Sequence, residues 1–271
     1  MSENKELSFN EVLNNLTKIS NTFSLPIYIP SLNENIEFKE LNTRQQKKLL
    51  ETLTDTSIYK TQFTKIFLEI IKENLIDKEF DISKFTIYDK IFIGLSLRSK
   101  ISDTLNVIFN ENPTYSEVID LSIITSKIKE FSHPISEVLS FNKNNTNIEV
   151  ELSVPSIVLE SKYEAELTKT TKKIEDIKDV NDIGNVLSEA FVGEVSKFIS
   201  KLSFDDNSID FINLTVNQRI KLTELLTADL TQTILQKVSN WKNSLDDILT
   251  ITSKDQKYTK TINIDNLLFL M

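Results

Sequence analysis

Short apolar segments of two different periods occupy separate blocks of this chain, and this separation constrains the fold more than any other feature. The helical period is clearest where apolar residues recur every three or four positions: Phe63, Ile66, Phe67, Ile70 and Ile71. The strand period is clearest where apolar residues alternate with polar ones: Ile148, Val150, Leu152 and Val154. Because the blocks do not alternate regularly, we predict an α+β fold with antiparallel hairpins, a small sheet, segregated helices and a helix-rich C-terminal part.

Local signals place several helix starts and two hairpins. In a capping box, a threonine hydroxyl accepts a backbone N–H three residues later, and the side chain there reaches back. Three pairs have this spacing: Thr43 with Gln46, Thr86 with Asp89, and Thr215 with Gln218. Extended residues flank turn-rich ones at 25–39 and at 244–264, which predicts a hairpin in each segment.

Three other segments complete the predicted organisation. Residues 118–124 fit a strand or a helix, residues 186–202 form a long apolar stripe that we interpret as helical, and residues 164–173 fit a solvated linker or an exposed helix. We predict a leading helix in residues 1–24 and an α+β domain of hairpin, helices and strands in 25–160. A linker or exposed helix in 161–184 and a helical domain in 185–271, ending in a hairpin and an apolar tail, complete the chain.

Composition excludes several classes of site. The chain of 271 residues has no cysteine, one histidine and three glycines, which excludes thiolate chemistry, multi-histidine metal sites and glycine-rich nucleotide loops. The net charge of −9 argues against nucleic acid as a partner, and the one local basic run, residues 168–173, lacks aromatic residues that stack on bases. We expect no signal peptide and no membrane-spanning segment, because no apolar run is long enough.

The residues that could perform catalysis have simpler structural interpretations. His133 could act as a general base only with a positioned partner, and we favour a structural turn histidine. The acidic pair that begins at Asp205 does not form a calcium loop, because Asp210 and Val216 stand where glycine and glutamate are required. Asp246 and its neighbour Asp247 fit a helix end better than a site. We therefore predict no catalytic, cofactor-binding or metal-binding residues.

Two apolar features are candidates for partner contacts. Trp241 is the only tryptophan, and a residue of this type lies either in a core or at an interface hot spot. The last residues are apolar and either pack on their own domain or insert into a partner. The candidate partner contacts are Trp241, Leu267, Leu268, Phe269 and Met271.

Three ordered segments together resemble a known family: residues 25–53, 80–100 and 211–270. The first has an extended Pro-Ile-Tyr-Ile-Pro and a strand Ile-Glu-Phe-Lys before a charged helix. The second runs from aspartate through a short loop and an apolar helix to Arg98-Ser-Lys100. The third opens with Phe211-Ile-Asn-Leu-Thr215. This order is similar to the baseplate hub family of T-even-type contractile-tailed bacteriophages, and with residues 148–157 the resemblance covers most of the chain.

The resemblance implies a non-enzymatic role in building a phage tail baseplate hub, through contacts with other tail or baseplate proteins. The expected location is the virion tail or, during assembly, the host cytoplasm. Members of the family often have cysteine pairs near hairpin turns, which suggests a metal site. This chain has residues 142–145 and 254–257 there, so any metal site is lost or replaced by ordinary turn chemistry. Two alternatives remain: an assembly chaperone or adaptor that leaves the particle, suggested by the apolar tail, and a hydrolase that uses His133.

Overall fold

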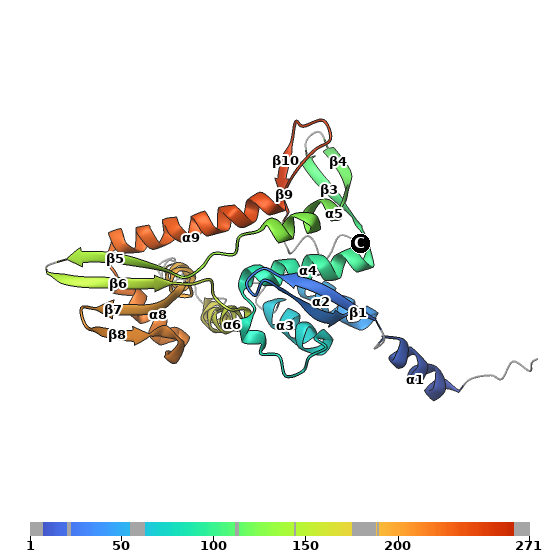
Figure 1. The fold of residues 1–271 in the computed structure, drawn as a ribbon, viewed down its shortest axis with the longest axis horizontal. Helices are drawn as coiled ribbons and strands as arrows, with labels where there is room; N and C mark the ends of the chain where they lie inside the picture. The colour runs from blue at the N-terminus through green and yellow to red at the C-terminus, as the bar shows by residue number, and fades with distance from the viewer. Residues whose placement is uncertain are drawn as a thin grey trace, which may run out of the picture.

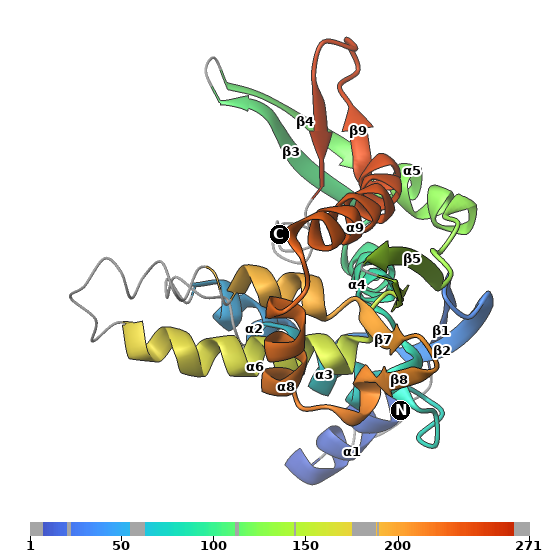
Figure 2. The same ribbon diagram turned by 90° about the vertical axis from the view of Figure 1, so that its left-hand side faces the viewer.

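The computed structural model describes residues 8–20, 23–54, 63–111, 114–143, 145–174, 188 and 190–262. Helices and antiparallel strands lie in separate groups along the chain, which confirms the predicted α+β fold (Figure 1). Within the described residues, the strands form three two-stranded sheets and one four-stranded sheet. Figures 1 and 2 show a branched outline, with hairpins and the first helix extending from a central body.

The N-terminal part contains a helix, the predicted first hairpin and two more helices: α1 (Phe9–Ser20), β1 (Ser24–Ile29), β2 (Glu34–Lys39), α2 (Thr43–Thr54) and α3 (Phe63–Asn74). In the hairpin Ile27 lies opposite Ile36. Its turn ends at Asn33, whose φ of 53° lies in the left-handed region that asparagine tolerates better than most residues. Apolar side chains of the hairpin, of α3 and of the next long helix form a small separate core.

The cap of α2 corrects one prediction. The Asn42 N–H donates to Gln45 Oε1 over 3.1 Å, and the Gln45 N–H donates to Asn42 Oδ1 over 3.0 Å. The capping box is therefore formed by Asn42 and Gln45, and the predicted box of Thr43 and Gln46 is wrong by one residue. Asparagine is a stronger N-cap than threonine, and the shift also lets Gln45 Nε2 donate to Glu73 of α3 over 2.9 Å.

The middle of the chain contains these elements: η1 (Ile82–Lys84), α4 (Ile87–Ile101), β3 (Thr104–Glu111), β4 (Thr114–Asp120), α5 (Ser122–Thr125) and η2 (Ser126–Glu130). The predicted capping box of Thr86 and Asp89 is confirmed at the start of α4. Residues 118–124, which fitted either structure, divide between the end of β4 and α5. The two strands pair as a hairpin with a β-bulge near Ile108.

The four-stranded sheet brings together two distant parts of the chain: β5 (Glu137–Lys143), β6 (Thr146–Leu152), β7 (Ile199–Phe204) and β8 (Asn207–Asp210). The prediction that residues 186–202 form one helical stripe is wrong for the last residues of that range. The helix that includes residues 190–196 ends before residue 197, and residues 199–202 belong to β7. Val150 lies opposite Leu202, so the apolar residues of β7 cover the same sheet face as those of β6. Asp205, with a φ of 48°, is in the turn to β8.

The C-terminal part is rich in helix: α6 (Ile157–Ile174), η3 (Phe211–Asn213), α8 (Val216–Glu224), α9 (Ala228–Leu249), β9 (Thr250–Thr252) and β10 (Thr259–Thr261). The predicted capping box of Thr215 and Gln218 is confirmed. The second predicted hairpin is also present, but it is shorter, because residues 244–249 belong to α9. Residues 164–173 lie within α6, which begins earlier than predicted. No helix in the described ranges is both long and apolar enough to cross a bilayer.

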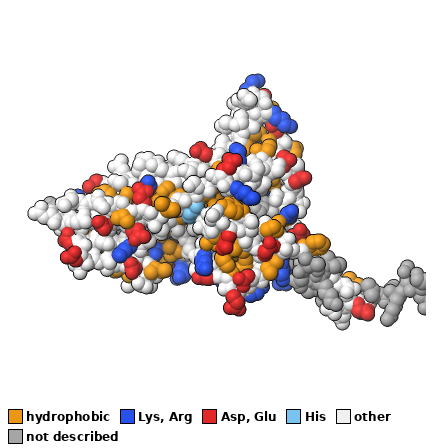
Figure 3. All heavy atoms as spheres, in the orientation of Figure 1, with side chains coloured by type: hydrophobic (Ala, Val, Ile, Leu, Met, Phe, Trp, Pro, Cys, Tyr) orange, Lys and Arg blue, Asp and Glu red, His pale blue; other side chains and the backbone are white. Residues whose placement is uncertain are grey.

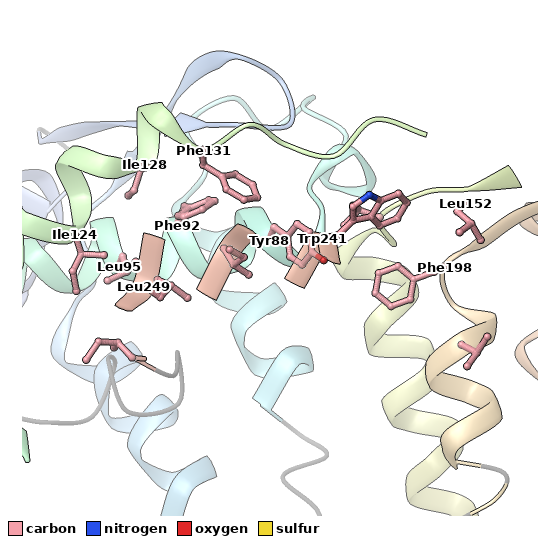
Figure 4. Packing of buried hydrophobic residues seen from close by; sticks show 14 of the residues in the cluster. Tyr88, Phe92, Leu95, Ile124, Ile128, Phe131, Leu152, Phe198, Trp241 and Leu249 are labelled. Atoms are coloured by element: carbon pink, nitrogen blue, oxygen red, sulfur yellow. The ribbon is translucent and has the colours of Figure 1, made fainter. Parts of the chain in front are cut away.

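The larger core lies along α9. Five buried residues of this helix face the interior: Leu230, Ile234, Trp241, Leu245 and Leu249. They join a cluster that includes residues of α4, of the β3–β4 hairpin and of the four-stranded sheet (Figure 4). This cluster takes residues from both sides of the predicted 161–184 segment, and the domain boundaries themselves stay a prediction.

We expect Trp241→Ala to lower the free energy of unfolding by about 3–5 kcal/mol, because it removes a large buried side chain from the centre of the core. Trp241 is 7% exposed and its ring centroid lies 6.3 Å from that of Phe198. Urea unfolding followed by circular dichroism measures the change. Leu225→Ala is the control, since Leu225 is 80% exposed and should change stability by less than about 0.5 kcal/mol. Similar effects of the two variants would contradict this packing.

Candidate functional site

His133 belongs to a hydrogen-bonded cluster at the start of α4. Its Nε2 lies 3.1 Å from Thr86 Oγ1, and the Thr86 hydroxyl donates to Asp89 Oδ2 over 2.7 Å. The buried Asp89 also accepts the backbone N–H groups of Thr86, at 2.7 Å, and of Ser31, at 3.2 Å. The cluster therefore joins the turn after β1, the N-terminus of α4 and the loop before β5. Figure 3 shows the imidazole, in pale blue, reaching the surface.

The order of these groups is unsuited to nucleophilic catalysis. In a catalytic triad the histidine lies between the acid and the hydroxyl, whereas here the hydroxyl of Thr86 lies between Asp89 and His133. The carboxylate is the better acceptor and the closer one, so it takes the Thr86 hydrogen, and His133 Nε2 then donates to the Thr86 oxygen. That oxygen also accepts the Asp89 N–H over 3.3 Å. This geometry favours the structural interpretation of His133.

Burial of the imidazole lowers the pKa of His133, although the negative charge of Asp89 opposes the shift. A folded-state pKa below the unfolded value means that stability is present above about pH 6.5 and is lost as the pH falls through the folded pKa. We expect His133→Gln to lower the free energy of unfolding by about 1 kcal/mol at pH 7.5. The deficit should shrink or reverse at pH 5, where the imidazole of the unfolded wild-type chain is protonated and the folded state loses stability relative to it. Urea unfolding at both pH values measures this, and a deficit that grows at pH 5 would be inconsistent with it.

A second polar cluster lies on the buried face of α6. Lys197 Nζ forms ion pairs with Glu160 at 3.0 Å and Glu194 at 2.6 Å. Burial alone would lower the pKa of Lys197, but the two carboxylates outweigh it and the pKa is raised. One turn further along α6, Glu164 accepts a hydrogen bond from Thr64 of α3. The cluster therefore links α6 to α3 and to the segment just before β7.

Burial raises the pKa of Glu164 to about 7, and hydrogen bonding to Thr64 only partly offsets this. Because the unfolded value is 4.5, the stabilising protonated form is fully present below pH 4.5, and its contribution is lost as the pH rises through about 7. Glu164→Gln keeps the acceptor for Thr64 and removes the charge. We expect it to raise the free energy of unfolding by about 1–2 kcal/mol at pH 8 and to have little effect at pH 4.5.

Thermal and urea unfolding at the two pH values test this expectation for Glu164. Glu130→Gln makes the same chemical change at an exposed position and should leave the free energy of unfolding unchanged at both pH values. If Glu164→Gln changes the free energy of unfolding equally at pH 8 and at pH 4.5, burial does not raise the pKa of Glu164 in the folded protein.

A cavity of 840 Å³ opens beside α6, between this helix, the loop before it and the segment from η3 to α8, and Lys197 is among its lining residues. Figure 2 shows α6 and α8 crossing in this region, and the two helices are in contact. Basic residues among those that line the cavity are Lys162, Lys169, Lys197 and Arg219, whereas Glu166 is the one acidic residue. The apolar residues of the lining include Val158, Leu159 and Ile212. A mixed lining of this kind can hold an anionic group beside an apolar one.

Two hairpins meet at the opposite end of the molecule and form one projection, which we call the hairpin pair (residues 104–111, 114–120 and 250–261). Lys260 Nζ donates to the Ile108 carbonyl over 2.8 Å, and the Lys254 N–H donates to Glu117 over 3.0 Å. The rings of Tyr115 and Tyr258 lie 5.3 Å apart. Figures 1 and 2 both show the hairpins side by side and away from the body. On the projection, Val118 is 61% exposed.

The residues predicted as partner contacts do not form one site. Trp241 is buried in the core, which agrees with the first of the two alternatives for it. Leu267, Leu268, Phe269 and Met271 lie outside the described residues. In the described part of the chain, no group of three histidine, aspartate or glutamate side chains is placed to bind a metal ion.

Sequence reasoning missed the cavity and the burial of Arg219. The only signal was the pair of basic residues Lys162 and Lys169, which lie seven positions apart and therefore on one face of a helix. Comparison of the chain with protein-family models, curated proteins and solved structures gives no match.

Proposed function

We propose that this chain is a non-enzymatic structural or assembly component of a bacteriophage tail baseplate hub, which acts through contacts with other tail or baseplate proteins. The observation that carries the proposal is the hairpin pair: a projection held by hydrogen bonds between its two halves, with apolar side chains on its surface. Preordered projections with exposed apolar residues suit association, since little conformational entropy is lost on binding. The ordered resemblance to the hub family supplies the biological setting.

Several features of the site support contacts rather than catalysis. The hydroxyl of Thr86 is fully engaged within the His133 cluster, and the buried Lys197 is neutralised by two carboxylates. Exposed apolar side chains are present at the extremities as well as on the body, for example Phe9 on α1 and Val118 on the hairpin pair. Such positions are accessible to neighbours in an assembly.

Deletion of the gene from the phage that encodes the chain tests this function. We expect particles with incomplete baseplates, visible by negative-stain electron microscopy, and restoration by the wild-type chain supplied in trans. A variant with Val118→Asp should restore assembly poorly, because it places a charge on the projection. Ser140→Asp makes a similar change on an exposed strand of the four-stranded sheet and should restore normally. Normal baseplates in the absence of the gene would refute the proposal.

The second candidate function is an assembly chaperone or adaptor, which the cavity beside α6 favours because it offers a place to hold a segment of another protein. Mass spectrometry of purified particles distinguishes the two. A structural component is present in a fixed ratio to other baseplate proteins, whereas an adaptor is absent from finished particles.

A further inference from the structure

Arg219 is the most unusual residue of the cavity beside α6. It is only 4% exposed. Its Nε donates to the Phe211 carbonyl over 2.8 Å, and its guanidinium carbon lies 5.6 Å from the centre of the Phe211 ring. Its Nη1 is buried and has no hydrogen-bond partner among the described residues. Among the described residues the Arg219 guanidinium has no ion-pair partner and its Nη1 has no acceptor. This is an unfavourable state for a buried cation.

The surroundings of Arg219 do not supply the missing acceptor. Glu166, the acidic residue of the lining, already accepts from Asn217 Nδ2 at 3.1 Å and from Lys169 Nζ at 2.9 Å. Glu160 and Glu194 pair with Lys197. The acids near the cavity are therefore engaged by other groups, and the guanidinium favours an anion from outside.

Two further features add positive potential to the cavity. Lys162 of α6 is exposed, lines the cavity and has no ion-pair partner among the described residues. The first residues of α8, Val216 and Asn217, also line the cavity, and the N–H groups at a helix start carry partial positive charge. The cavity is thus locally basic on a chain whose net charge is −9.

The rest of the lining identifies the kind of anion. Apolar side chains form much of the wall, and Ile212 at its edge is 84% exposed. The lining contains no aromatic residue on which a base could stack. A ligand that matches both properties has a carboxylate next to aliphatic side chains, as a peptide with alternating acidic and aliphatic residues does.

We propose that the cavity between α6 and α8 binds an acidic, aliphatic peptide segment of a partner protein, with its carboxylate directed to Arg219 and Lys162. This inference rests on the proposed function, because it names the chemistry of one partner contact. Arg-carboxylate pairing gives the segment its orientation, and the aliphatic side chains displace water from the apolar wall.

Fluorescence anisotropy with purified full-length chain tests the proposal. The probes are a labelled peptide of alternating leucine and glutamate, the same peptide with glutamine for glutamate, and a third with serine for leucine. We expect the first to bind at least about tenfold more tightly than either of the others. Inorganic phosphate in large excess should compete only weakly, because it cannot occupy the apolar wall.

Lys162→Glu is the decisive variant, since Arg219→Ala would also remove the bond to Phe211 and could impair folding. We expect Lys162→Glu to raise the Kd of the acidic peptide by about fivefold or more. Lys221→Glu makes the same charge change on the exposed side of α8, away from the cavity, and should bind as wild type does. Circular dichroism confirms that both variants fold.

Each opposite result overturns the inference. Equal affinity for the acidic and glutamine peptides excludes a role for the carboxylate, and equal affinity for the leucine and serine peptides indicates a simple anion site. Equal losses in the two lysine variants indicate non-specific attraction. Absence of binding at about 1 mM peptide excludes a useful site. The assay does not involve phage assembly, so it can fail while the deletion phenotype still supports the proposed function.

Discussion

Burial of one face of α9 is the interaction on which the rest of the structure depends. A helix of 22 residues is about 33 Å long, so it can contact both the four-stranded sheet near Leu230 and the α4–α5 region near Leu249. Figure 4 shows Trp241 beside Phe198 and Leu249 near Leu95. Because neither half of the hairpin pair has enough apolar surface to be stable alone, their positions follow from attachment to the core along this helix.

Buried polar contacts then determine how the smaller N-terminal core joins the larger one. Asp89 accepts hydrogen bonds from the turn after β1 and from the start of α4, and Thr86 extends the contact to His133. Hydrogen bonds to a buried carboxylate are directional and costly to leave unmade. They therefore define the relative orientation of the hairpin, the helix and the loop more narrowly than apolar contact alone would.

The sequence was informative where a signal is local. The boxes at Thr86 and Thr215, the first hairpin and the strand around Val150 depend on residues within a few positions of one another, and all were predicted. Residues 199–202 were assigned to a helix because their apolar side chains continue a helical spacing, but β6 offers an unpaired edge that draws them into a strand. The contact between Thr86 and His133 and the burial of Arg219 depend on distant segments, so no local pattern reveals them.

Arg219 differs from Lys197 and Asp89 in how its buried charge is partnered. Lys197 is paired twice, and Asp89 accepts several donors, so neither gains from an added ligand. Arg219 keeps a buried nitrogen without an acceptor, at a cost of roughly 1–3 kcal/mol. A carboxylate that reaches it recovers that free energy only in the bound state. In the bound state, the deficit that slightly weakens the free protein would become affinity, which is why we place the proposed partner contact on the side of α6 that faces α8 and not at the His133 cluster.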